Sequence, residues 1–447
     1  MMMRRYFMPF RSLLGPRGQV ILRTGSWSLI AKMTSAVNLF LSVPFVLHAL
    51  GPIEFGAWAT LASLIVFAGF LDFGLGNGTM NLVAAAHGRG DMDEIAAVIQ
   101  EGRRTLWKIA TALAVIIVIA APLVPWYRLL GLPLVLAGNS RWAAIAVLFA
   151  IALAAPLNLA NRVQLGLGQG NVAFRWQATA QFITLGLVIL LARSGASFPI
   201  LTAATVLTPL LGSLANTLSL SHNSAFAAPG TRRPDLAQRI RHEGLLFFVL
   251  QLAAALAYSA DLPLISALRG PDDAGTYAIV QRLFSIIPLG LSLVWAPLWP
   301  IYRHALAAGH YAWVVHTLRR SVVMAMCFAS VIGTMIIVGF NWIIRIWLHH
   351  VAHVPVQLLV GFVAWAVLDA GGTALATFLN AASVIRFQVI TASIFAVACF
   401  GLKILVVAKT SIEWLPWVTV TTWTLANALP LLCFRQRILN GIFMRDY

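Results

Sequence analysis

The sequence predicts an all-α polytopic membrane protein with about 12 transmembrane helices, arranged as two six-helix lobes around a central cavity. Three observations predict this class. Hydrophobic residues make up 60% of the 447 and charged residues 10%, with a mean hydropathy of +0.86, which is too apolar for a soluble chain of this length. Apolar runs of roughly 20 residues recur along the chain. One nine-residue pattern occurs twice, about half a chain apart.

The apolar runs fall into two sets of six, separated by one polar stretch. Each run is long enough to cross the hydrocarbon core of a bilayer as a helix. The first six spans are expected at 25–49, 56–80, 106–125, 142–163, 172–192 and 197–219. The second six are expected at 244–266, 277–301, 321–341, 356–380, 387–408 and 415–433. The expected divisions are a basic cytoplasmic arm 1–24, a first lobe 25–220, a cytoplasmic linker 221–243, a second lobe 244–433 and a cytoplasmic tail 434–447.

The doubled pattern has the form G-P-x-[DE]-x-G-x-[WY]-A. It reads GPIEFGAWA at Gly51–Ala59 and GPDDAGTYA at Gly270–Ala278, an offset of 219 residues. Each copy joins the first two spans of its half, where Gly-Pro favours a tight turn. We expect structural hairpins, with Trp58 and Tyr277 at the level of the lipid headgroups. Duplicated halves of this kind are typical of transporters, and an even number of spans per half predicts that both halves run in the same direction.

The distribution of positive charge predicts the orientation in the membrane. If the N-terminus is cytoplasmic, 20 Lys and Arg residues lie in cytoplasmic segments and six on the opposite side. This asymmetry predicts that both termini are cytoplasmic and that both repeats lie on the outer face. The net charge of +17 is explained by this orientation signal. Because the cations are scattered among apolar runs, they form no basic face for a nucleic acid.

Lys32 is the first candidate for a cavity residue. It lies about two turns into the first span, where Ser35 and Ser42 share its helical face and Asn38 lies at the edge of that face. A polar stripe on a membrane helix is expected to face water or protein. The alternative is a lysine that extends to the inner headgroups. The stripe favours a cavity.

The repeat offset extends this expectation to the second lobe. It aligns Lys32 with Gln251 and Ser42 with Asp261, and Tyr258 shares the face of these two residues. The first helix of each lobe thus carries a polar stripe at matching positions. We therefore expect both helices to line the central cavity, with Lys32, Asn38, Gln251 and Tyr258 as binding residues.

Several other ionisable residues lie inside predicted spans, where a charge is costly without a partner or a cavity. Asp72, in LDFGLGNG, is either functional or a structural carboxylate near a break in the helix. Asp369 begins a stripe with Thr373, Thr377 and Asn380, which either carries an ion or holds helices together. Arg282 either binds an anionic group in the cavity or extends to the headgroups. Asp261, Asp369 and Asp72 are the candidates for coupling to a proton or a sodium ion.

The remaining ionisable and sulfur-containing residues predict no further chemistry. Arg175 and Lys403 lie close to span ends, so we expect both to extend to the headgroups. The run HHVAH at His349–His353 has no acidic residue near it, and we expect no metal site and no cofactor. The cysteines have no paired spacing and are expected to serve in packing. Without a Walker motif or a reactive acid–base cluster, we expect no enzyme.

Two segments carry a resemblance to a known family. The segment Leu50–Asp91 resembles the signature of Wzx-type polysaccharide and O-antigen repeat-unit flippases. It reads LGPIEFGAWATLASLIVFAGFLDFGLGNGTMNLVAAAHGRGD. These flippases belong to the multidrug/oligosaccharidyl-lipid/polysaccharide (MOP) exporter superfamily. The segment Ser259–His310, with its Asp, its G-x-Y hairpin and its Pro at the end of the eighth span, resembles the corresponding part of the second half.

The resemblance implies a MOP/MATE-like fold whose two lobes open a central cavity alternately to each side. It implies translocation of undecaprenyl-diphosphate-linked oligosaccharides from the inner to the outer leaflet of the bacterial inner membrane, for surface polysaccharide synthesis. Lys32 and Arg282 are then expected to hold the diphosphate. The implied partners are the lipid-linked oligosaccharide, membrane lipids, and the polysaccharide polymerase and chain-length machinery. The alternatives are a cation-coupled drug or metabolite antiporter of the same fold and a membrane scaffold for glycan assembly.

Overall fold

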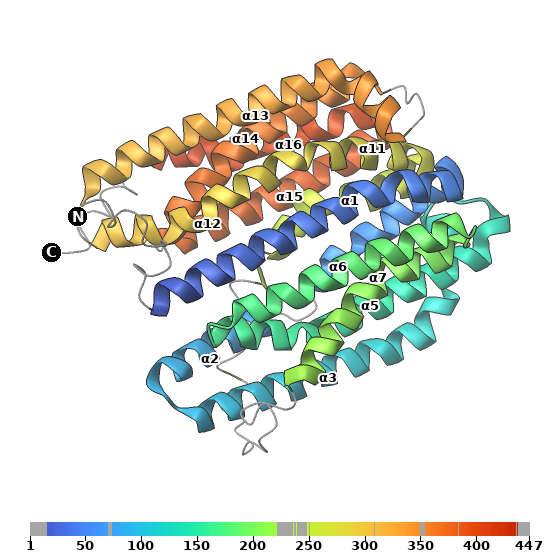
Figure 1. The fold of residues 1–447 in the computed structure, drawn as a ribbon. Helices are drawn as coiled ribbons and strands as arrows, with labels where there is room; N and C mark the ends of the chain where they lie inside the picture. The colour runs from blue at the N-terminus through green and yellow to red at the C-terminus, as the bar shows by residue number, and fades with distance from the viewer. Residues whose placement is uncertain are drawn as a thin grey trace, which may run out of the picture.

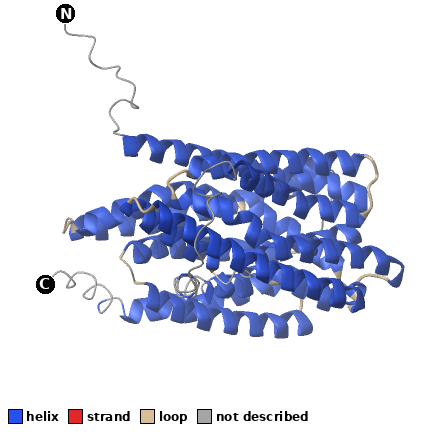
Figure 2. Ribbon diagram, turned by 90° about the horizontal axis from the view of Figure 1, so that it is seen from below, coloured by secondary structure: helices blue, strands red, loops and turns tan. Residues whose placement is uncertain are grey.

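The computed structural model describes residues 16–69, 74–220, 251–307, 309–348, 354–382 and 384–434, together with 236, 238, 248–249 and 436. The regular elements of these residues are all helices, which run roughly parallel to one long axis (Figure 2). Eleven stretches of the described residues are long and apolar enough to cross a membrane. The first of them, Arg23–Gly69, has 47 residues and turns at Gly51, so it supplies two crossings and the total agrees with the predicted twelve.

The first lobe is the lower half of the molecule in Figure 1, drawn in blue to green. Helix α5 lies at its centre and packs against α2, α3 and α7, while α6 packs against α1 and α7. Small residues on α5 such as Ala143 and Ala150 are fully buried, and they allow the close helix packing that is typical of membrane bundles. The elements are α1 (Pro16–Ser63), α2 (Leu75–Arg89), α3 (Met92–Ala120), α4 (Trp126–Leu129), α5 (Ala137–Gly166), α6 (Gly170–Arg193) and α7 (Phe198–Leu220).

The second lobe is the upper half in Figure 1, drawn in yellow to red. Helix α14 lies at its centre and packs against α12, α13 and α16. Two π-helical turns, Ala255–Ser259 and Thr424–Ala428, interrupt the regular helices of this lobe. The elements are α10 (Asp261–Arg269), α11 (Pro271–Phe284), α12 (Ile286–Ala307), α13 (Tyr311–Leu348), α14 (Val356–Ala381), α15 (Ile385–Lys409) and α16 (Leu415–Trp423).

Several helices are longer than the predicted spans. Helix α3 begins at Met92, not near residue 106, because Asp91 caps it: its carboxylate accepts a hydrogen bond from the backbone N–H of Glu94 at 2.9 Å. Hydropathy finds only the apolar part of such a helix. The second span is interrupted by a 3-10 turn at Leu64–Gly69 and by the left-handed Gly74 (φ 76°), which agrees with a break at the glycine-rich segment. Asp72 itself lies outside the described residues.

The two nine-residue repeats contact each other at one end of the molecule, which we call the repeat end. It lies at the right in Figure 1, where α1 and α11 meet. Each repeat turns at its first glycine, with φ of 72° at Gly51 and 101° at Gly270, a conformation that favours glycine. The predicted hairpins are confirmed. The second glycines form the contact itself: a Cβ on Gly56 would lie 1.6 Å from the carbonyl oxygen of Pro271, and one on Gly275 would lie 3.3 Å from the Gly56 Cα.

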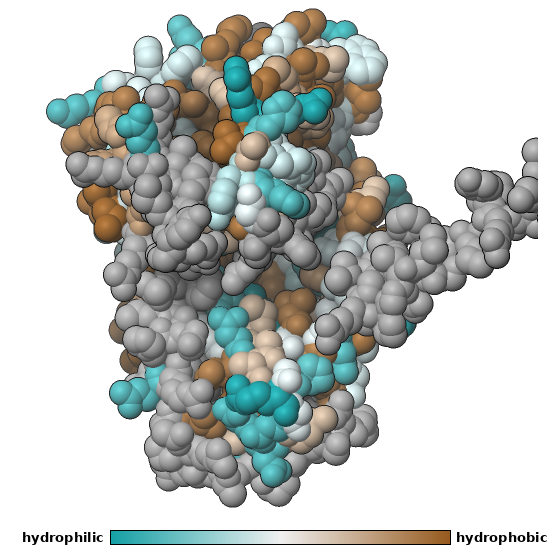
Figure 3. Space-filling view, turned by 90° about the vertical axis from the view of Figure 1, so that its left-hand side faces the viewer, coloured by the Kyte–Doolittle hydropathy of each residue, from teal (hydrophilic) through white to brown (hydrophobic). Residues whose placement is uncertain are grey.

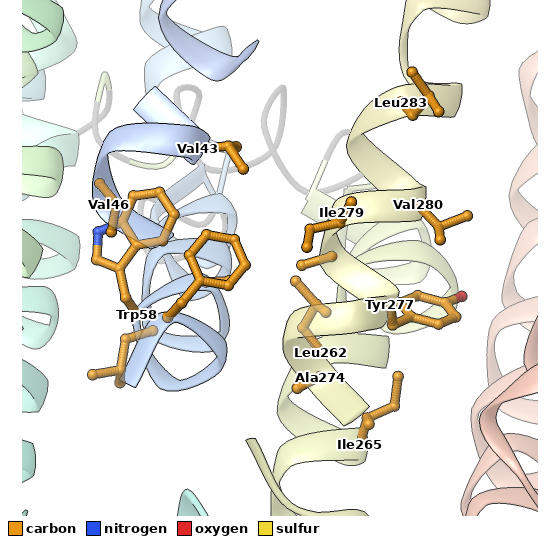
Figure 4. Packing of buried hydrophobic residues seen from close by; sticks show 14 of the residues in the cluster. Val43, Val46, Trp58, Leu262, Ile265, Ala274, Tyr277, Ile279, Val280 and Leu283 are labelled. Atoms are coloured by element: carbon orange, nitrogen blue, oxygen red, sulfur yellow. The ribbon is translucent and has the colours of Figure 1, made fainter. Parts of the chain in front are cut away.

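The aromatic residues of the two repeats are buried inside the protein, whereas we expected them to contact the lipid headgroups. Trp58 is 1% exposed and Tyr277 2%, and their polar atoms point away from each other, each into its own lobe (Figure 4). The Trp58 indole N–H donates to Thr205 Oγ1 at 3.1 Å, and the Tyr277 hydroxyl donates to Asp261 Oδ2 at 2.8 Å. Each ring is buried because the repeat lies between the lobes, and each polar atom therefore has a partner inside.

Two further hydrogen bonds join the lobes near the repeat end. Ser266 Oγ donates to the carbonyl oxygen of Leu130 at 2.9 Å, and the Trp347 indole N–H donates to the carbonyl oxygen of Phe40 at 2.9 Å. At the opposite end, where α1 begins, Figure 3 shows a recess between the two halves. In the part of the chain that the structure describes, the lobes thus meet at the repeat end and are separated by this recess at the opposite end.

The glycine contact predicts that a methyl group at position 56 opens the repeat end. Overpacking costs about 1–3 kcal/mol, and 1.4 kcal/mol is about a tenfold change in an equilibrium. In a background without Cys327, Cys399 and Cys433, we expect Gly56→Ala to raise the labelling rate of Ser285→Cys by about tenfold. The label is a membrane-impermeant thiol reagent applied from the side of the repeat end.

Gly186→Ala is the matched control for this experiment, because a Cβ at Gly186 on α6 meets no atom within 4 Å. Gly275→Ala is the milder variant if Gly56→Ala does not fold, because its new Cβ would lie 3.3 Å from its nearest neighbours. Equal labelling rates in the folded variants and the control would show that the glycine contact does not close this end.

Candidate functional site

A cavity of about 1310 Å³ lies between the lobes. It begins at the repeat contact and extends toward the middle of the molecule. Its first-lobe wall comes from α1, α5, α6 and α7, and its second-lobe wall comes mainly from α11 and α12. It reaches from Trp58 near the repeat end to Arg162 and Leu165 at the opposite end of α5. The recess of Figure 3 is at this opposite end.

The polar stripe of α1 lines this cavity, as the sequence predicted. Lys32, Ser35, Asn38 and Ser42 all belong to the wall. Lys32 and Ser42 are ten residues apart, so the stripe extends about 15 Å along the cavity. The Lys32 ammonium donates to Ser292 Oγ across the cavity at 3.2 Å. Lys32 therefore faces the interior of the protein and does not extend to the headgroups.

Arg282 also lines the cavity, close to the repeat end. Its guanidinium carbon lies 4.8 Å from the centroid of the Trp58 ring, a cation–π contact between the lobes. Its Nη1 atom is buried and has no hydrogen-bond partner among the described residues. A buried charged donor without a partner costs free energy. A bound anion would remove that cost.

The charged residues in the described part of the cavity wall are all cations. Lys32, Arg162 and Arg282 belong to the wall, and none of its described residues is Asp, Glu or His. Between low-dielectric walls such a set produces a positive potential that attracts anions.

Lys32 and Arg282 lie at different depths in the cavity. The partner of Lys32, Ser292, follows Arg282 by ten residues along α11 and α12, which corresponds to about 15 Å along the helix path. The two cations are therefore attached to the wall at different depths along the cavity. They mark two separate positions for an anionic group.

The expectation that Gln251 and Tyr258 line the cavity is wrong, since neither belongs to its wall. The Tyr258 ring packs inside the second lobe, 5.3 Å from Trp365 and 5.6 Å from Phe395 between ring centroids. The offset assumes the same helical register in both lobes. The π-helical turn Ala255–Ser259 holds one extra residue per turn and so changes the face on which Tyr258 and later residues lie.

The expectation that Lys403 extends to the headgroups is also wrong. Lys403 is 1% exposed, and its ammonium donates to Asp261 Oδ1 and to the Ala257 carbonyl oxygen, both at 2.7 Å. With the hydrogen bond from Tyr277, both carboxylate oxygens of Asp261 have a partner. Asp261 therefore lies in a buried ion pair inside the second lobe and not on the cavity wall. Its coupling role is not tested by this geometry and stays a prediction.

Of the other two candidates for coupling to a proton or a sodium ion, only Asp369 lies within the described residues. Asp369 on α14 lies inside the second lobe, close enough to Tyr258 for an electrostatic interaction, and it does not belong to the cavity wall. Its ion-coupling role stays a prediction. Asp72 lies outside the described residues, as does the histidine run at 349–353.

The sequence interpretation missed the carboxamide residues of the first-lobe wall. Asn158 and Asn161 on α5 and Gln177 and Gln181 on α6 line the cavity. Asn38 Nδ2 donates to Gln181 Oε1 at 2.6 Å. Their spacings of three and four residues inside apolar spans are helical spacings, and the same test that selected the α1 stripe would have found them.

No protein-family model and no curated protein matches this sequence. Among solved structures, a multidrug resistance MATE family transporter of the MOP superfamily is similar in its inward-facing conformation, with a TM-score of 0.70, 14% identity and 97% of each chain covered. A MATE family transporter of the MOP superfamily in an outward-facing conformation has a TM-score of 0.66 and 15% identity, with 96% of this chain and 97% of that chain covered.

A MOP superfamily transporter from Pyrococcus furiosus is similar as well. It has a TM-score of 0.65 and 14% identity, with 95% of this chain and 97% of that chain covered. It is described as having a binding pocket of reverse polarity that suggests a different function. At these identities the similarity establishes the fold alone. The chain has the fold of the MOP superfamily, a multi-pass membrane protein with two helical lobes.

The buried ion pair predicts that Lys403→Met strongly destabilises the protein. The substitution leaves the Asp261 carboxylate buried without its counter-ion, which costs roughly 3–5 kcal/mol. The double variant Asp261→Asn with Lys403→Met removes both charges and should recover most of the loss. The measurement is the thermal unfolding temperature in detergent. Lys409→Met is the control, because this lysine is exposed at the end of the same helix. An unfolding temperature unchanged by Lys403→Met would contradict the structural role.

Proposed function

We propose that the protein translocates undecaprenyl-diphosphate-linked oligosaccharides from the inner to the outer leaflet of the bacterial inner membrane, for the synthesis of a surface polysaccharide. The proposal places both termini in the cytoplasm, as the positive charges predict. The repeat end then faces outward, and the present conformation has its cavity open to the cytoplasm. The lipid-linked oligosaccharide is the proposed substrate, with polysaccharide polymerase and chain-length proteins as proposed partners.

The observation that carries the proposal is the charge of the cavity. Its described wall has three cations and no acid, and one of the cations has a buried donor without a partner. Arg and Lys bind phosphate oxygens through charge-assisted hydrogen bonds, which are strong in a low-dielectric cavity. The volume of about 1310 Å³ exceeds that of ordinary small-molecule pockets. Both properties fit a large anionic headgroup whose lipid tail stays in the bilayer.

The two cation positions suggest how the diphosphate moves. It first meets Lys32 near the open end, and then Arg282 near the repeat end, about 15 Å further along the helix path. Arg282 contacts Trp58 across the lobe interface. A diphosphate at Arg282 therefore competes with this cation–π contact and favours separation of the lobes at the repeat end. Rocking of one lobe against the other then exposes the headgroup to the outer face.

A cation-coupled drug or metabolite antiporter is the rival function on the same fold. The multidrug transporters among the similar structures make the fold equally consistent with it. A cationic drug, however, would need acids in the cavity, and the described wall has none. For either function, Asp369 is the coupling residue that we propose to test first, because Asp261 is held by Lys403.

The first test is depletion of the protein in its host. The proposal predicts that lipid-linked oligosaccharide accumulates on the cytoplasmic leaflet and that surface polysaccharide is lost. The antiporter predicts normal surface polysaccharide and increased drug sensitivity. Absence of accumulation would overturn the flippase function.

The second test is binding of undecaprenyl diphosphate to the purified protein in nanodiscs. Lys32→Gln and Arg282→Gln should each weaken binding by about tenfold or more, since a hydrogen bond to a charged group contributes about 1.5–3 kcal/mol. Lys409→Gln removes an exposed cation at the end of α15 and is the control. If both cavity variants bind like the control, the cations do not hold the diphosphate.

A further inference from the structure

We infer that the first-lobe wall of the cavity is a glycan-binding face, formed by five carboxamide side chains. They come from α1, α5 and α6, and we call this surface the amide wall. The inference rests on the proposed function and adds to it the place of the sugar, as distinct from the diphosphate. The five residues are Asn38, Asn158, Asn161, Gln177 and Gln181.

Carboxamides match the hydrogen-bonding groups of sugars. A sugar hydroxyl both donates and accepts, and an acetamido group does the same. Each carboxamide offers two N–H donors and one carbonyl acceptor, so it satisfies both kinds of group at once. A lysine or arginine can only donate. The cations of the cavity therefore suit the phosphates, whereas the amide wall suits the uncharged polar surface of an oligosaccharide.

Several of these amides are held in fixed orientations. Asn158 Oδ1 accepts from Asn161 Nδ2 at 3.1 Å and from Ser213 Oγ at 2.8 Å. Gln181 Oε1 accepts from Asn38 Nδ2 at 2.6 Å. Among the described residues, no hydrogen bond uses the N–H₂ groups of Asn158 and Gln181, and Gln177 is exposed in the cavity. Fixed side chains with free donors bind with a small loss of conformational entropy.

Helix packing accounts for only part of this polar network. Gln164 and Asn216 are 1% and 0% exposed and exchange hydrogen bonds at 2.8 and 3.0 Å, as polar residues that join membrane helices do. Neither belongs to the cavity wall. Asn158, Gln177 and Gln181 do belong to it, and packing does not explain amides that face an open cavity.

Aromatic residues lie on the same wall. Phe174 and Trp176 on α6 line the cavity beside Gln177. Their rings offer flat apolar area against which the C–H face of a pyranose packs, in the way that aromatic side chains combine apolar contact with polar neighbours at binding sites. Amides and rings together are therefore suited to sugar recognition.

The two lobes contribute unequally to this surface. The second lobe supplies one carboxamide to the described wall, Gln281, against five from the first lobe. It supplies instead the deep cation, Arg282. The glycan thus stays with the first lobe while the second lobe moves past it. The diphosphate is the group that interacts with both lobes in turn.

The test compares two lipids on the same variants in nanodiscs. One probe is bare undecaprenyl diphosphate, and the other is the undecaprenyl-diphosphate-linked oligosaccharide extracted from host cells depleted of the protein. We expect the wild type to bind the glycan-bearing lipid more tightly. Gln177→Leu, Gln181→Leu and Asn158→Leu should each reduce its affinity by about fivefold, the usual effect of one lost hydrogen bond, and should leave binding of the bare lipid unchanged.

Gln388→Leu is the matched control, because this amide bonds to Asn380 on the second lobe, away from the cavity. Thermal unfolding identifies any variant that is misfolded, and Gln177→Leu, at the exposed position, is the least disruptive of the three. If the folded variants keep the full preference for the glycan-bearing lipid, or lose both lipids equally, the amide wall is not the glycan site. A wild type that binds neither lipid refutes the proposed function itself.

Discussion

The close approach of two backbone segments at the repeat end determines the shape of the cavity. Only a glycine allows the Pro271 carbonyl oxygen to reach the Cα of position 56, because any Cβ there would overlap it. The contact joins one helical hairpin from each lobe, so the two lobes meet at this contact. Everything on the inner side of it, including the cavity and its cations, depends on the lobes being held together at this end and apart at the other.

The aromatic residues of the same repeats connect this contact to the interior of each lobe. Trp58 bonds to Thr205 within the first lobe, and Tyr277 bonds to Asp261 within the second. Through Asp261 the second hairpin is tied to Lys403 on α15. Each repeat is therefore bonded to its own lobe, whereas the two hairpins meet each other through the glycine surfaces of Gly56 and Gly275. A rigid-body change of the lobes is the motion that such an arrangement permits.

Under the proposed function, two kinds of polar group in the cavity divide the recognition of the substrate between them. Lys32 and Arg282 lie at different depths, and five carboxamides belong to the first-lobe wall that runs along the cavity. Arg282 also contacts Trp58, so the residue that we propose to bind an anion is part of the lobe junction. In the proposed mechanism, anion binding and opening of the repeat end are thereby coupled through the Arg282 side chain.

The sequence by itself determined the class of fold, the number of spans and the two hairpins. It also determined that the polar stripe of α1 faces the cavity. Each follows from local hydropathy, glycine and proline chemistry or helical spacing, which do not depend on distant residues. Hydropathy did not give the full lengths of α3 and α13, because their ends are polar but still helical. The aligned residue Tyr258 was misplaced because the π-helical turn Ala255–Ser259 changes the helical register from that point on, and no periodicity shows such a turn. The structure gives no comparable reason for Gln251, which precedes the turn.

Only the tertiary structure decided which polar residues face the same space. Lys403 and Asp261 are 142 positions apart, and their pairing replaces the expected contact with lipid headgroups. The amides of α5 and α6 and the cations of α1 and α11 meet only because the helices pack in this arrangement. The physical reason is that the packing of the whole bundle decides whether a charged side chain is buried and which group it pairs with. The positions of spans and turns, in contrast, depend on the local sequence.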